Sequence, residues 1–230
     1  MIAHGHMDAY TARNELGLEN AARPVFCFER FGRTVTLLPD GRVVFVGGEH
    51  EDHYDPDFFI YNDVVVVHGR VEPAQRSDFR MYSDTLEDDA NELWKTAWSA
   101  RGVSPEQIDI YRYPVDVFAP TDFHSATYYK DEGTGKEYIY IIGGLGYPNS
   151  IHRDATVTYR LDLGDFSIRR MRTSGQEPPP GDGTERITTL VGDAIEVVDM
   201  EDTYTLSLVD LQWSVEDGPV GRGRRVFWRE

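Results

Sequence analysis

The chain has 230 residues, with 40 acidic residues against 23 Lys and Arg, so its formal net charge at pH 7 is −17. Such a surface repels nucleic-acid phosphates and anionic membranes, and it suits both solubility and a basic protein partner. A single cysteine, Cys27, excludes an intrachain disulfide and a zinc site made of cysteines.

Residues 1–24 read as an N-terminal extension that lacks the basic region and apolar run of a signal peptide. The longest purely aliphatic run, 64–67, is far shorter than the roughly 20 residues that span a bilayer. We therefore expect a cytoplasmic protein without a membrane partner. Cys27 lies in an apolar run and is expected to be a small core residue, not a nucleophile.

Two strands are predicted at about 26–38 and 42–47, joined by the turn residues Pro39-Asp40-Gly41. The double glycine at 47–48 ends the second strand, because residues without a Cβ let the chain take φ > 0. A further strand follows at 61–67.

The loop 49–57 between these strands holds two histidines and five carboxylates. His and Asp are ligands for zinc, manganese or iron, but their spacing here matches no closed metal motif. We interpret the stretch as a binding loop in which His50, His53 and Tyr54 contact a partner.

A helix is predicted over about 84–102, inside an insertion at 68–110. Its apolar residues recur at helical spacing, and they are Leu86, Ala90, Leu93, Trp94, Ala97 and Trp98. The stripe is expected to pack against a sheet or to dock a partner. Residues 108–113 then alternate and are predicted to form the outer strand of the first group.

The stretch 124–162 contains three short runs of β-branched and aromatic residues, which predict a strand meander. Residues 138–142 are apolar on both faces and are predicted to form a central buried strand, which the glycines at 143–144 end. A fourth strand is predicted at 167–172. The loop 145–154 corresponds to the loop at 50–57, and its candidate binding residues are Tyr147, Asn149, His152 and Arg153.

Residues 174–184 form a proline-rich linker, after which strands are predicted at 185–190, 194–198 and 204–213. The end of the chain, 218–230, is its one basic stretch. Arg222, Arg224 and Arg225 suit an anion or the acidic body of the protein. Residues 225–229 alternate and suit an added edge strand.

These motifs form an ordered set, which consists of His124-Ser125-Ala126, Tyr140 to Gly144, Tyr159 to Asp162, Thr34 to Gly41 and Val46 to Gly48. In this the chain resembles kelch-repeat proteins. The resemblance implies a mainly β fold, a kelch-like β-propeller or partial propeller of antiparallel four-stranded blades at about 26–115, 117–173 and 184–217. The third copy has Val198-Asp199 in place of the double glycine but keeps Tyr204 and Trp213.

Three copies are too few for the usual closed ring of four or more blades. We therefore expect an open array whose edges are covered by the predicted helix, by the C-terminal tail or by a second chain in a homodimer. A fourth blade too degenerate to recognise is the alternative.

The sequence contains no phosphate-binding glycine loop, no G-x-S-x-G motif and no H-E-x-x-H motif. We therefore expect a non-enzymatic module, without cofactor or metal, that binds a protein partner through one loop face. In kelch-like propellers a histidine at the position of His124 is structural and bonds to neighbouring backbone. The alternative is a sugar-modifying enzyme, which the resemblance also allows, with His50, His53, His124, His152 and Arg153 around a central pocket.

Overall fold

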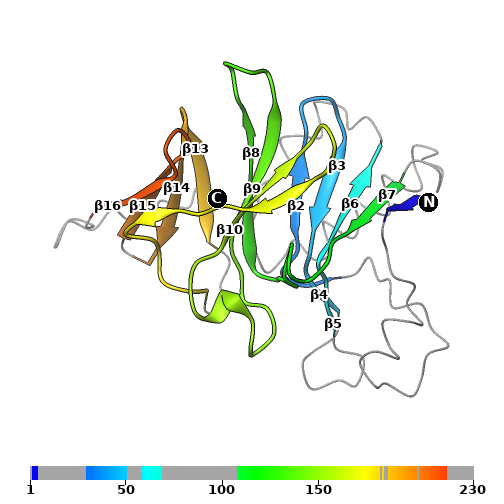
Figure 1. Cartoon of the computed structure of the whole chain (residues 1–230), viewed down its shortest axis with the longest axis horizontal. Helices are drawn as coiled ribbons and strands as arrows, with labels where there is room; N and C mark the ends of the chain where they lie inside the picture. Colours follow the sequence, from blue (N-terminus) through cyan, green and yellow to red (C-terminus); the bar gives the residue numbers. More distant parts are fainter. Residues whose placement is uncertain are drawn as a thin grey trace, which may run out of the picture.

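The computed structural model describes residues 2–4, 30–50, 59–68, 108–181, 183, 186–200 and 202–216, with the backbone alone for 2–4 and for residue 50. Strands account for 50% of it and helix for almost none. Three larger sheets follow one another across the molecule in the order of the sequence (Figure 1). A fourth sheet has two short strands, β4 Glu49–His50 and β5 Phe59–Ile60. The described residues form no closed barrel or propeller. Nor do they include a helix with the length and apolar character that crossing a membrane requires.

The first sheet has the strand order β1-β7-β6-β3-β2. Its strands are β1 Ile2–His4, β2 Thr34–Leu37, β3 Val43–Val46, β6 Asp63–Val67 and β7 Ile108–Arg112. We predicted that 108–113 would be the outer strand, and this is wrong, because β1 pairs with it in parallel. Without β1, the outer edge of β7 would leave its N–H and C=O groups unpaired, and β1 forms hydrogen bonds with them.

The second sheet is an antiparallel meander with the order β11-β10-β9-β8. Its strands are β8 His124–Lys130, β9 Glu137–Gly143, β10 Thr158–Asp162 and β11 Ile168–Arg170. The predicted strands at 138–142 and 167–172 are confirmed at these positions. The β9–β10 connection contains one short 3-10 helix, η3 Ile151–Arg153.

The third sheet has the order β12-β16-β15-β14-β13. Its strands are β12 Ser174–Gly175, β13 Ile187–Val191, β14 Ala194–Asp199, β15 Asp202–Ser207 and β16 Gln212–Glu216. The strand-forming run at 204–213 belongs to a hairpin, β15 and β16. The linker does more than connect two sheets, because Ser174 and Gly175 pair in parallel with β16.

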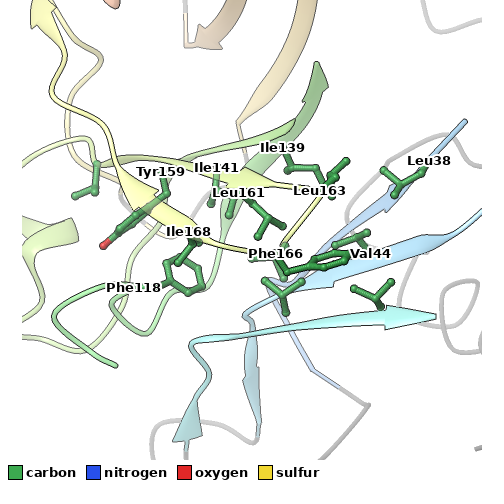
Figure 2. Close-up of a cluster of buried hydrophobic side chains, with 14 residues drawn as sticks. Leu38, Val44, Phe118, Ile139, Ile141, Tyr159, Leu161, Leu163, Phe166 and Ile168 are labelled. Carbon is green, nitrogen blue, oxygen red and sulfur yellow. The ribbon is translucent and has the colours of Figure 1, made fainter. Parts of the chain in front are cut away.

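Strand β9 is apolar on both faces because each face packs into a different core. Ile139 and Ile141 point into a core shared with the first sheet, where they meet Val44 and Leu38 (Figure 2). The alternate residues, which are Tyr138, Tyr140 and Ile142, point into a second core shared with the third sheet. Because successive side chains of a strand leave on opposite faces, β9 is buried from both sides, and the predicted central strand is confirmed.

One edge strand of each sheet, β2, β8 and β13, lies where the three sheets meet. Strand β8 contacts β2 on one side and β13 on the other. A hydroxyl–hydroxyl hydrogen bond of 2.9 Å joins Thr127 on β8 to Thr188 on β13. The three sheets therefore spread outward from the neighbouring strands β2, β8 and β13 (Figure 1).

Several predicted features lie outside the described residues. They are Cys27, the loop residues His53 and Tyr54, the predicted helix at 84–102 and the basic tail at 218–230. The described strands β6 and β7 are antiparallel neighbours, so the insertion begins and ends on adjacent strands of one sheet.

Candidate functional site

The segment 121–124, which leads into β8, passes between the glycine turns of the first two sheets. The Gly48 N–H donates to the Thr121 carbonyl at 2.9 Å, and the Leu145 N–H donates to the Asp122 carbonyl at 3.0 Å. A Cβ at Gly47 would overlap the Thr121 carbonyl oxygen, and one at Gly144 would overlap the Thr121 hydroxyl. The double glycines therefore let another segment pass at backbone contact distance, besides ending strands.

His124 ends this crossing with its ring buried. Its Nε2 lies 2.9 Å from the Thr34 hydroxyl on β2, so the ring joins the first two sheets. The ring is structural, but the backbone partner that we predicted is wrong, because the hydroxyl of the neighbouring strand reaches it. Burial and, to a smaller extent, the nearby His152 lower the pKa of His124 to about 3. The ring is therefore neutral at pH 7.

Asp122 is the buried carboxylate of this crossing. Its Oδ1 accepts a hydrogen bond from the Gly146 N–H at 2.6 Å, which fixes the start of the loop 145–154. Burial raises the pKa of the Asp122 carboxyl. Interactions with three other residues lower the pKa of Asp122 and so offset part of this rise: the Gly146 hydrogen bond, a side-chain hydrogen bond with Glu49, and the positive charge of Arg153. Glu49 belongs to β4 Glu49–His50, so Asp122 links the loops of both sheets.

We expect Asp122→Asn to make the protein less sensitive to rising pH. A raised carboxyl pKa means that the folded state holds this proton more firmly than the unfolded chain, so its contribution to stability is lost as pH rises through the folded pKa. The Asn oxygen still accepts from Gly146, but the side chain carries no charge. Thermal unfolding should give the largest gain in Tm over the parent near pH 8, shrinking toward pH 4.

Asp122→Ala is the matched control for that substitution. It also removes the charge, but it leaves the buried Gly146 N–H without its acceptor, so it should lose about 1–3 kcal/mol at every pH. An Asn variant that loses stability as Ala does would contradict this account of Asp122.

The loop 145–154 is held in place at several points and still exposes side chains. The Ile60 N–H, on β5 Phe59–Ile60, donates to the Tyr147 hydroxyl at 2.9 Å. Arg153 donates to the Gly146 carbonyl at 3.3 Å. Pro148, Asn149, Ile151, Arg153 and Asp154 face solvent. The loop thus presents a fixed surface beside the β4–β5 pair (Figure 1).

The predicted binding residues do not all reach this surface. Asn149 and Arg153 are exposed and Tyr147 is half-buried, but His152 is 0% exposed. The His152 ring packs beside Tyr159, with ring centroids 6.1 Å apart, because η3 turns it into the core. Burial lowers the pKa of His152 to about 4, so it is a neutral core residue there. Only the backbone of His50 is described, within β4.

Two buried arginines link neighbouring segments, and no sequence pattern singled them out. Arg30 holds Asp63 through both guanidinium nitrogens, at 2.5 and 3.0 Å, and donates to the Gly47 carbonyl at 3.0 Å. Arg186 donates to the Pro179 carbonyl at 2.5 Å and to Asp199 at 3.0 Å. Their partners lie up to 33 residues away, so local spacing carries no signal for them.

Across the part of the chain that the structure describes, no three His, Cys, Asp or Glu side chains come close enough together to hold a metal ion. What the site offers is a fixed polar and aliphatic surface above a buried hydrogen-bond network. Comparison with protein-family models and with curated proteins finds no match to this chain.

Proposed function

We propose that this protein is a non-enzymatic interaction module that binds a protein partner through the loop face of its first two sheets. The observation that carries the proposal is the loop 145–154. Its backbone is held by Asp122 and by the contact between Ile60 and Tyr147, while Asn149, Ile151 and Arg153 remain exposed. A surface already fixed in the free protein loses little conformational entropy on binding, which favours affinity.

The scaffold in this proposal is a kelch-like partial propeller with three blades. Three mainly antiparallel sheets, in which β8 lies against both β2 and β13 and whose faces share two cores, support this interpretation. The formal charge of −17 favours a basic partner, because potentials of opposite sign raise the association rate. A cytoplasmic location belongs to the same proposal.

The alternative of a sugar-modifying enzyme receives no support from the site. His124 and His152 are neutral and buried in the packing between sheets, while Arg153 lies outside on the loop. These three residues do not line a common surface.

The proposal is tested by affinity capture with three proteins: the parent, a loop variant and a surface control. The loop variant carries Asn149→Ala, Ile151→Ala and Arg153→Ala. The control carries Lys130→Ala at the exposed end of β8 and Glu132→Ala in the turn that follows. A specific partner should be captured by the parent and the control and be reduced at least tenfold with the loop variant.

Direct binding of the purified candidate should reproduce that tenfold difference in Kd. Melting temperatures of the parent and the control should agree, and the loop variant should melt only slightly lower, because Arg153→Ala also removes the hydrogen bond to the Gly146 carbonyl. A partner that binds the loop variant as tightly as the parent would exclude this face, and the absence of any captured protein would count against the interaction module itself.

A further inference from the structure

The outer face of the third sheet is the exposed end of the array. Alternate residues of β13 to β16 point away from the core shared with the second sheet. One row across this outer face runs through Ile187, Val198, Thr203 and Glu216, which are directly opposite one another on successive strands. Ile187 is 53% exposed and Val198 is 43% exposed, so an aliphatic pair lies open on this face.

The third sheet is also acidic without exception. Residues 187–216 contain no Lys, Arg or His, and their acidic residues are Asp193, Glu196, Asp199, Glu201, Asp202, Asp210 and Glu216. Glu196 and Glu216 belong to the outer face by their register. The face therefore suits an occupant that combines cationic and apolar side chains.

We propose that this outer face binds the C-terminal segment 218–230 of the same chain. That segment has the complementary chemistry, with Arg222, Arg224, Arg225 and Arg229 around Val226, Phe227 and Trp228. It follows β16 directly, and β16 ends at Glu216, in the same row as Ile187 and Val198. The occupant is thus tethered beside its site.

The tether is long enough to reach the aliphatic pair. The row from Glu216 to Ile187 crosses three strand spacings, or about 14 Å at ~4.8 Å each. Residues 217–221 span about 16 Å when extended, at ~3.3 Å per residue. The arginines and aromatic residues that follow can therefore lie over the aliphatic pair while the carboxylates of Glu196 and Glu216 face the guanidinium groups.

The test is methyl NMR on protein labelled at Ile and Val, in the full chain and in a chain truncated after Asp217. Truncation should shift the methyl signals of Ile187 and Val198. It should leave Val209, 80% exposed in the β15–β16 turn, unmoved. A synthetic peptide of residues 218–230 should restore the shifts saturably, and its Kd should rise at least tenfold between 50 and 500 mM NaCl, roughly as screening predicts.

Substitutions distinguish binding at this face from nonspecific attraction between the basic peptide and the acidic protein. In the truncated chain, Val198→Lys should weaken peptide binding at least tenfold, whereas Val209→Lys should change it less than twofold. In the full chain, the pair Arg224→Glu and Arg225→Glu should move the Ile187 and Val198 signals as truncation does, which keeps the test independent of truncation.

Several results would overturn the proposal. They are methyl signals that neither truncation nor excess peptide moves, equal affinities for the two Lys variants, and equal binding of a peptide with the same composition in scrambled order. Shifts that appear only at concentrations where light scattering detects dimers would assign the face to the tail of a second copy and exclude the intramolecular contact.

Discussion

Lowering the pH from 8 to 5 should cost this protein roughly 4 kcal/mol of its free energy of unfolding through two histidines alone. Burial lowers the pKa of His124 to about 3 and that of His152 to about 4. Above about pH 6.5 both rings are neutral in the folded and the unfolded chain. Below it the unfolded chain takes up two protons that the folded protein cannot accept, at ~1.4 kcal/mol for each proton and pH unit.

The measurement is urea unfolding at pH 8 and pH 5 for the parent and for the double variant His124→Gln, His152→Gln. The variant should be less stable at pH 8, because two packed rings are lost, but its stability should fall much less on acidification. Ser125→Ala is the matched control, since Ser125 is buried beside His124 and does not titrate. The same pH dependence in parent and double variant would show that the rings are not held neutral by burial.

The second large effect is expected from Gly144→Ala, which should destabilise the protein by about 3 kcal/mol or more. Gly144 has φ +105°, and a Cβ there would overlap the Thr121 hydroxyl and approach the Asp122 carbonyl oxygen to 3.1 Å. The added methyl group therefore meets backbone, which cannot move without displacing the segment that leads into β8. Thermal and urea unfolding of the variant measure this cost.

Gly192→Ala is the control for Gly144→Ala, because Gly192 has φ +59° but no atom within 4 Å of an added Cβ. It should cost only about 1 kcal/mol of backbone strain. Adding Thr121→Ala to Gly144→Ala should recover part of the loss, because it removes the overlapping hydroxyl. Equal losses for the two glycine variants would mean that the crossing is not tight.

The succession of strands could be predicted from the sequence because each strand and turn depends on residues close together in the chain. Turn residues such as Pro39-Asp40-Gly41 mark hairpins, and runs such as 138–142 mark strands buried on both faces. The candidate loop 145–154 was also identified, by its equivalence to the loop at 50–57. The side chains of Asn149 and Arg153 lie on its surface, as expected of binding residues, but His152 does not.

His152 was misplaced because a strand or loop pattern does not show which way a short turn rotates its residues. Whether η3 points its histidine out or in depends on its contact with Tyr159 in the folded protein. The partner of His124 was missed for a similar reason, since Thr34 lies 90 residues away.

The sequence by itself determined most of the strands, their turns and the faces that are buried, since these depend on periods of two and on residues a few positions apart. It did not predict β1 and β12, which form by pairing in parallel with distant strands. Only the tertiary structure decided why glycines are needed at the two double-glycine turns. The turns at 47–48 and 143–144 are crossed by the segment 121–124. Val198 stands at the equivalent position of the third sheet and is 43% exposed, so a Cβ has room there. A glycine is required where another part of the chain comes within contact distance, and only the folded arrangement brings that part there.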